Sequence, residues 1–85
     1  MASATRQVHV RFFAILREQA GCASLEIESA AATPAELYAE LRTQYAGLTF
    51  PSELLRVSIN ERYAAMTAPL AAGDRIVFIP PVAGG

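Results

Sequence analysis

The sequence predicts a small α+β domain in which one mixed sheet curves around a single main helix. Apolar and polar residues alternate over two early segments, a strongly marked helix start follows, and shorter alternating segments fill the rest of the chain. Roughly five strands are expected from this pattern. With 85 residues the chain has room for one modest core and no second domain.

The two early segments predict a hairpin of strands over residues 8–15 and 24–29, joined by a long connection. Alternation in the first segment places one set of side chains in the core, namely Val8, Val10 and Phe12. The other set faces outward: His9, Arg11, Phe13 and Ile15. We expect His9 to be a solvated strand residue, with no carboxylate positioned beside it. Between the strands, residues 16–20 favour a helical turn that ends at Gly21.

The main helix is expected to begin at the segment Thr33-Pro34-Ala35-Glu36. A hydroxyl at the N-cap, a proline at the first helical position and a glutamate three residues after the cap are typical of a helix start. Apolar side chains then share one helix face, namely Leu37, Tyr38, Leu41 and Tyr45. Gly47 is expected to end the helix.

The C-terminal half predicts three short strands over residues 55–59, 63–66 and 75–79. Asn60 and Glu61 should form a tight turn between the first two, because asparagine tolerates the left-handed conformation. In the last strand, Ile76 and Phe78 should point into the core. The outward set would then be Arg75, Val77 and Ile79.

Charge and composition argue against several classes of function. The formal net charge of -1 disfavours a nucleic-acid partner, which needs a basic surface. No apolar run approaches the ~20 residues that cross a membrane, so we expect no membrane contact and a soluble cytoplasmic protein. The single cysteine, Cys22, cannot form an internal disulfide, and no spacing of histidine, cysteine and carboxylate residues predicts a metal site.

The last eight residues, Phe78-Ile79-Pro80-Pro81-Val82-Ala83-Gly84-Gly85, carry the feature that points to a function. Pro80 and Pro81 donate no backbone hydrogen bond, so the strand should end before them and the chain should continue in an extended path. Gly84 and Gly85 lack a Cβ atom, so they fit a channel too narrow for any side chain. We expect residues 80–85 to form an extended tail that presents the Gly85 carboxylate, the alternative being a frayed end.

Catalytic motifs are missing from the rest of the sequence, which contains no recognisable nucleophile elbow, phosphate loop or zinc-protease motif. The basic residues are all arginines, seven in number. Arginine stays protonated and cannot act as an acyl acceptor, so lysine-linked chains of this protein are chemically excluded.

Three stretches together resemble a known family: RFFAILRE at residues 11–18 with Gly21, LAAGD at residues 70–74, and FIPPVAGG at residues 78–85. They are similar to the small subunit of molybdopterin synthase, a ubiquitin-like sulfur carrier with the β-grasp fold. The resemblance covers essentially the full chain. Pro-Pro-Val-x-Gly-Gly after a strand is fairly specific, whereas Gly-Gly alone also fits thiamin-type carriers and ubiquitin-related modifiers. The chain departs from the family in its extra residues before Val8 and in Ile79, where an aromatic is frequent.

This resemblance implies a β-grasp domain whose chemistry takes place in other proteins. The Gly85 carboxylate would be adenylated by a partner that resembles ubiquitin-activating enzymes and that holds the ATP and magnesium, while this chain binds no cofactor. A sulfur donor protein would then supply the sulfur of a thiocarboxylate. In a heterotetramer, the large subunit of molybdopterin synthase would provide the catalytic residues that transfer this sulfur to the pterin precursor.

The resemblance also implies two contact regions for these partners. Tail residues would lie in the partner's channel, namely Pro80, Pro81, Val82, Ala83 and Gly84. Outward apolar residues, expected to be neighbours on adjacent strands, would form the docking surface: Phe13, Val77 and Ile79. Two alternatives stay open, namely another sulfur carrier or protein modifier with the same tail, and a β-grasp binding module whose tail is inert.

Overall fold

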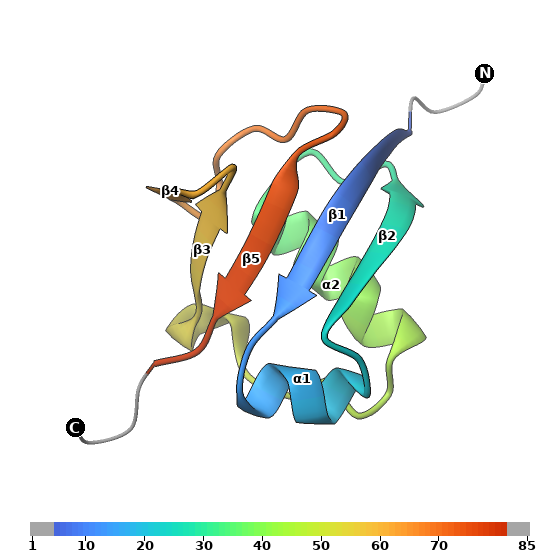
Figure 1. The fold of residues 1–85 in the computed structure, drawn as a ribbon, viewed down its shortest axis with the longest axis vertical. Helices are drawn as coiled ribbons and strands as arrows, with labels where there is room; N and C mark the ends of the chain where they lie inside the picture. Colours follow the sequence, from blue (N-terminus) through green and yellow to red (C-terminus); the bar gives the residue numbers. More distant parts are fainter. Residues whose placement is uncertain (1–4, 82–85) are drawn as a thin grey trace.

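A five-stranded mixed sheet with a helix packed against one face makes up the computed structural model, which describes residues 5–81 (Figure 1). The strands are β1 (Arg6–Phe12), β2 (Ser24–Ser29), β3 (Arg56–Ile59), β4 (Arg62–Ala64) and β5 (Arg75–Ile79). The helices are α1 (Ile15–Ala20), α2 (Pro34–Gln44) and the short 3-10 helix η1 (Ser52–Leu54). In this part of the chain, no helix is long and apolar enough to span a bilayer.

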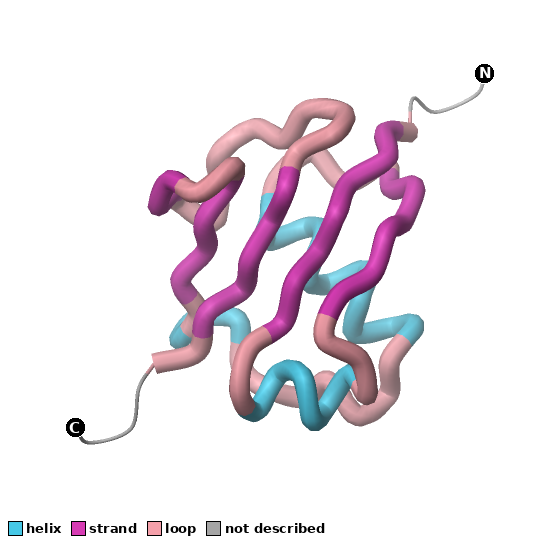
Figure 2. Tube along the Cα trace, in the orientation of Figure 1, coloured by secondary structure: helices cyan, strands magenta, loops and turns pink. Residues whose placement is uncertain are grey.

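The strand order is β2-β1-β5-β3-β4, so the first and last strands lie side by side in the middle of the sheet (Figure 2). β1 and β5 are parallel, whereas β1–β2, β3–β5 and β3–β4 are antiparallel. A parallel pair needs a long crossover, and the segment that contains α2 covers one face of the sheet on the way. This is the predicted β-grasp arrangement, which the structure confirms.

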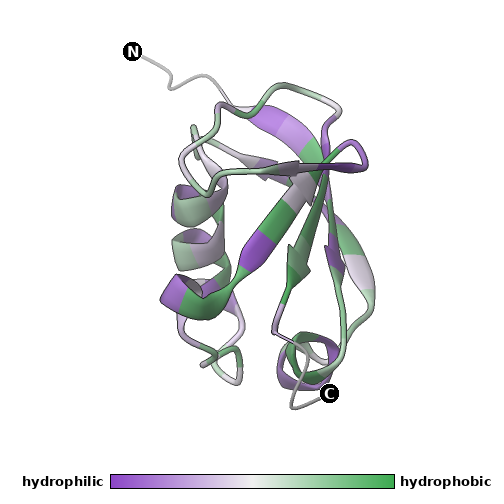
Figure 3. Ribbon diagram, turned by 90° about the vertical axis from the view of Figure 1, so that its left-hand side faces the viewer, coloured by the Kyte–Doolittle hydropathy of each residue, from purple (hydrophilic) through white to green (hydrophobic). Residues whose placement is uncertain are grey.

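The core lies between α2 and the inner face of the sheet (Figure 3). The inward residues expected from alternation in β1 and β5 are all buried: Val8, Val10, Phe12, Ile76 and Phe78. From the helix, Tyr38 stacks at a tilt on Phe78 with 5.2 Å between ring centroids. The inner and outer faces of the sheet are therefore those that the sequence predicted.

The first strand is shorter at its C-terminal end than the expected range of residues 8–15. β1 ends at Phe12, and Ile15 already begins α1. Ala14 causes the break, because its φ of 53° and ψ of -127° are incompatible with a strand. As predicted, α1 ends at Gly21, which adopts the left-handed conformation with a φ of 79°.

The N-terminus of α2 has the predicted cap. The Thr33 hydroxyl accepts a hydrogen bond from the Glu36 backbone N–H at 3.2 Å, and the Glu36 carboxylate accepts one from the Ala32 N–H at 2.9 Å. The predicted stop at Gly47 is wrong, because the helix ends at Gln44. Gly47 serves close packing instead, since a Cβ atom there would lie 2.7 Å from the backbone oxygen of Gln19.

The two strands around the predicted tight turn are shifted by one or two residues from the expected ranges. β3 begins at Arg56 rather than at residue 55, and β4 covers residues 62–64 rather than 63–66. Asn60 and Glu61 form the turn with φ values of 54° and 72°. β5 has the predicted bounds and ends directly before Pro80.

Candidate functional site

An open apolar hollow of about 660 Å³ lies where β5 ends and the chain leaves the sheet. Its lining comes from three separate segments: Phe13, Ala14 and Ile15; Phe50; and Ile79, Pro80 and Pro81. All seven side chains are apolar, so the hollow has no group that could act as an acid or a base. Its chemistry is that of a contact surface.

One wall of the hollow is the sharp connection between β1 and α1. The backbone at Ala14, which is the N-cap of α1, turns the chain so that Phe13 and Ile15 remain on the surface. These side chains are 44% and 40% exposed, which is high for large apolar residues. The Phe13 ring also carries the guanidinium of Arg11, whose carbon lies 5.7 Å from the ring centroid.

Phe50 is another part of the lining, and three hydrogen bonds hold its backbone and that of Thr49 in place. The side-chain oxygen of Gln19 accepts from the backbone N–H groups of Thr49 and Phe50, each at 3.0 Å. The Tyr38 hydroxyl donates to the Phe50 carbonyl oxygen at 2.7 Å. Desolvation by burial raises the pKa of Tyr38, and the positive charge of Arg42 partly offsets this effect. The hydroxyl therefore keeps its proton and stays a donor.

Sequence reasoning missed Phe50 and Gln19. No helix or strand was predicted for the segment that contains Phe50, and Gln19 was expected only in a short helical turn. Both become part of the site through contacts between residues about thirty positions apart, for which the sequence carries no local signal. The only hint was Gly47, whose position next to Gln19 requires the absence of a side chain.

The predicted docking residues are brought together only in part. Phe13 and Ile79 both line the hollow, although Phe13 lies beyond the end of β1 and not on a strand. Val77 is outside the hollow, because it lies two residues before Ile79 on the same face of β5, opposite Arg11 and Ser58. The expectation that all three residues are neighbours on adjacent strands is therefore corrected.

The predicted tail begins inside the folded domain. Pro80 is buried and Pro81 is exposed, so the first residue of the predicted tail over residues 80–85 packs against the domain. Burial of Pro80 beside Ile79 fixes the point from which the chain leaves the hollow. The other tail residues, from Val82 to Gly85, lie outside the described residues.

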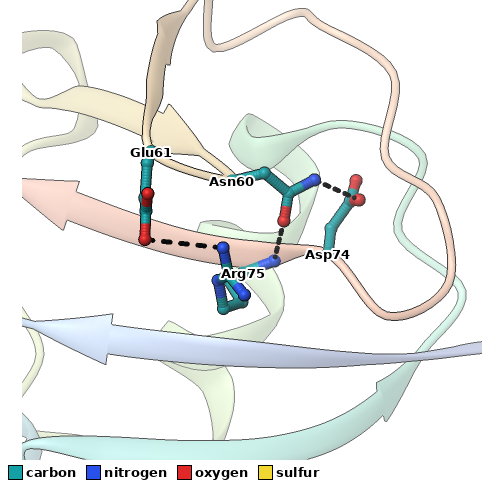
Figure 4. A network of polar contacts seen from close by, with 4 residues as sticks. All are labelled: Asn60, Glu61, Asp74 and Arg75. Carbon is teal, nitrogen blue, oxygen red and sulfur yellow. Dashed lines mark hydrogen bonds and ion pairs between the residues drawn. The ribbon is translucent and has the colours of Figure 1, made fainter.

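A network of polar contacts lies at the opposite end of β5 (Figure 4). The Asn60 side chain donates to the Asp74 carboxylate at 2.9 Å and accepts from the Arg75 backbone N–H at 2.9 Å. Asp74 also accepts from the Ala71 N–H at 2.8 Å, and Arg75 approaches Glu61 at 3.5 Å. These groups satisfy one another, and the network joins two turns of the chain.

His9 differs from its expected environment. The Glu26 carboxylate lies 3.4 Å from His9 Nδ1, and its other oxygen accepts from the side chain of Gln7 at 3.1 Å. The expectation that no carboxylate is positioned near His9 is thus wrong, because the antiparallel register places His9 directly opposite Glu26. Both side chains are exposed, so this pair is an ordinary surface contact.

Comparison with known proteins identifies the family of the chain. The ThiS family matches residues 10–85. No curated protein sequence matched the chain. A crystal structure of SAMP1 from Haloferax volcanii is 27% identical with a TM-score of 0.76, and the match covers 93% of this chain and 99% of that one.

Two further solved structures are complexes with a second protein. A complex of subunits 1 and 2 of molybdopterin-converting factor from Helicobacter pylori 26695 contains a chain that is 30% identical, with a TM-score of 0.64 and coverage of 93% of this chain and 99% of that chain. The Amycolatopsis orientalis BexX/CysO complex contains one that is 26% identical, with a TM-score of 0.69 and coverage of 92% and 99%.

Proposed function

The chain belongs to the ThiS family, and from this premise we propose that it is the sulfur carrier subunit of molybdopterin synthase. The observation that carries the proposal is the position of the Pro-Pro-Val-Ala-Gly-Gly sequence. It follows directly on β5, at an open apolar hollow to which its two prolines contribute. A docked partner would therefore hold the domain at the point where the tail enters that partner.

The proposed chemistry begins at the Gly85 carboxylate. A carboxylate is a poor electrophile, so a partner that resembles ubiquitin-activating enzymes first joins it to AMP, with ATP and magnesium bound by that partner and pyrophosphate released. The outer sulfur of a persulfide on a sulfur donor protein then attacks the acyl carbon and releases AMP, and a thiol reduces the resulting acyl disulfide to the thiocarboxylate. This group is the stronger nucleophile, and it donates sulfur to the pterin precursor in the large subunit.

In this reaction the chain binds the partner protein and sets the direction in which its tail leaves the domain. Phe13, Ile79 and Phe50 provide apolar contact area for a partner. Burial of Pro80 and the fixed φ of both prolines limit the directions in which the tail leaves the domain. The similar chain from Helicobacter pylori is described together with a second subunit, which supports association with a partner protein. We propose that this partner is the large subunit and that the working assembly is a heterotetramer.

A second candidate is another role for the same activated tail. The similarity to SAMP1, whose name describes a small archaeal modifier protein, favours a protein modifier, and the similarity to the CysO chain favours a different sulfur carrier. All of these roles would use the same hollow and the same carboxylate. They differ in the protein or small molecule that accepts the acyl group or the sulfur.

Intact-mass measurement tests the proposal directly. The purified chain is incubated with ATP, magnesium, the activating enzyme and the sulfur donor of the same organism, and then with the large subunit and the pterin precursor. We expect a gain equal to the mass difference between sulfur and oxygen, which is lost again when the precursor is converted. A chain that gains no sulfur contradicts the carrier function, whereas stable sulfur in the presence of large subunit and precursor contradicts only the molybdopterin role.

A further inference from the structure

Charged side chains on the outer face of the sheet are separated along the direction of the strands. At the end near the polar network, Arg75, His9 and Glu26 form one row across β5, β1 and β2. Glu26 lies near His9 and Glu61 near Arg75, and Glu28 lies on the same face of β2, opposite Gln7. This end of the outer face therefore contains acidic as well as basic groups.

The rows nearer the hollow contain arginines but no acid. One row crosses the whole sheet: Ser24, Arg11, Val77, Ser58 and Tyr63. The next row pairs Ile79 with Arg56. Arg11 and Arg56 are exposed, and within residues 5–81 neither has an ion-pair partner. Two uncompensated guanidinium groups thus flank the last strand just before the chain leaves the sheet.

Arg11 and Arg56 are close enough for one protein partner to contact both. Two strand spacings of roughly 4.8 Å and an offset of two residues put their Cα atoms about 12 Å apart. Arg11 reaches the rim of the hollow, because its guanidinium lies over the ring of Phe13. Arg56 lies directly opposite Ile79, which lines the same hollow. Both charges therefore border one apolar centre, as arginines often do in protein interfaces.

We propose that Arg11 and Arg56 bind an acidic protein partner. This partner places an apolar side chain in the hollow and a carboxylate against each guanidinium group. Charge complementarity indicates that the partner surface is acidic, because a purely apolar surface would leave the two guanidinium groups without a counter-charge at the edge of the interface. For the identity of the docking protein this inference rests on the proposed function. The acidic character of the partner surface is the new claim, and it can be tested without that protein.

Two dyes that differ only slightly in shape but differ in charge separate the electrostatic contribution to binding from the apolar contribution. Anilinonaphthalene sulfonate has an aromatic body and one negative charge, and N-phenylnaphthylamine has a similar body and none. We expect the double variant Arg11→Gln/Arg56→Gln to bind the anionic dye roughly fivefold to tenfold more weakly, as two exposed charge contacts allow. Its affinity for the neutral dye should stay within about twofold, since the apolar lining is unchanged.

Two further variants separate charge position from net charge and from structure. Arg42→Gln/Arg62→Gln removes the same total charge from α2 and β4 and should bind both dyes as the wild type does. Arg11→Lys/Arg56→Lys keeps the charge and should restore most of the preference for the anion. Equal losses in the two glutamine variants, or no loss for Arg11→Gln/Arg56→Gln, would overturn the inference.

The second part of the experiment measures the affinity of each variant for the large subunit of molybdopterin synthase from the same organism. Wild-type affinity should fall as salt is added, and this dependence should be weaker in Arg11→Gln/Arg56→Gln than in the Arg42→Gln/Arg62→Gln control. If the wild type binds with no salt dependence, the inference is wrong although the proposed function stands. If the wild type does not bind at all, the proposed function fails, and the dye pair still decides the inference.

Discussion

The two ends of β5 differ in whether their surface groups have partners within the domain. At its start, Asp74 and Asn60 bind each other and the backbone of neighbouring turns, so the polar groups of this end have partners within the domain. At its end, Phe13 and Ile79 border an open hollow that no described residue covers. A strand of five residues thus connects a region completed by contacts within the domain with an apolar region that is open in the described part of the chain.

This contrast shows why the same kind of substitution should have different effects at the two ends. Removing a group from the polar end breaks contacts that the folded chain makes and the unfolded chain lacks, so stability falls. Removing an exposed apolar group from the hollow should cost the free domain less, because much of the surface of that group is already in water. The cost appears when a partner binds.

The largest expected effect is on binding at the open end. Phe13→Ala should weaken association with the large subunit by about 30-fold, or about 2 kcal/mol, as for other central aromatic contacts. Thermal unfolding should change little, because Phe13 is 44% exposed. Tyr63→Ala is the matched control, since this aromatic is 79% exposed and lies on β4, outside the hollow. Calorimetric titration and thermal melts of both variants check the prediction, and equal loss of affinity in the two would remove the hollow from the docking surface.

The next effect is on stability at the polar end. Asp74→Ala removes acceptors from the Asn60 side chain and from the Ala71 N–H, and it should lower the free energy of unfolding by about 2 kcal/mol. Affinity for the large subunit should stay unchanged, because the network lies at the far end of β5 from the hollow. Urea denaturation measures the first quantity and titration the second. If Asp74→Ala kept its stability but no longer bound the large subunit, the polar end of β5 would belong to the docking surface and the prediction would be wrong.

A smaller effect, of opposite sign, is expected at Ala14. Its φ of 53° and ψ of -127° suit glycine and strain any residue with a Cβ atom. Ala14→Gly should therefore raise the free energy of unfolding by about 1 kcal/mol, even after the entropy that glycine adds to the unfolded chain. Ala20→Gly, in the ordinary conformation of α1, should instead destabilise the domain by about 1 kcal/mol. If Ala14→Gly is destabilised as well, the turn before α1 is not strained.

The smallest expected effect concerns Tyr38, the buried hydroxyl that holds Phe50. Burial raises its pKa above the ordinary value of 10.0, so the folded state keeps the proton at a pH where the unfolded chain loses it. This contribution to stability is complete below pH 10.0 and is lost as the pH rises through the folded-state pKa. The alkaline loss of stability should be smaller in Tyr38→Phe than in the wild type. Identical pH profiles in unfolding experiments would show that the hydroxyl ionises freely.

Most of the fold could be predicted from local patterns, because alternation and capping depend on near neighbours in the sequence. Thr33 and Glu36 marked the start of α2, and Phe12 and Phe78 were assigned to the correct face. The end of β1 could not be predicted, because alternation continues through Phe13 and only the backbone of Ala14 breaks it. Gly47 was misassigned because its reason is a contact with Gln19 that the sequence does not show.

The candidate site was predictable only where it coincides with the tail motif. Ile79 and Pro80 belong to that motif, and both line the hollow. Phe50 joins them through tertiary contacts to Gln19 and Tyr38, so no pattern in its own segment identifies it. Val77 was assigned to the docking surface because it alternates with core residues, but alternation gives the face of a strand and not the position along it.

The central claim is that the domain exists to thread its tail into a partner, and substitution of Gly84 tests it most directly. The measurement is the rate of ATP-dependent adenylation by the activating enzyme for the wild type, Gly84→Ala and Gly84→Val, with thermal melts of each. If the tail enters a narrow channel, the rate should fall from glycine to alanine and collapse with valine, whose branched Cβ needs more room. The three melting curves should coincide if the tail makes no core contacts, since changes outside the core usually stay within ~0.5 kcal/mol. Equal adenylation rates for all three proteins would contradict the claim, because the carboxylate would then react without entering a channel.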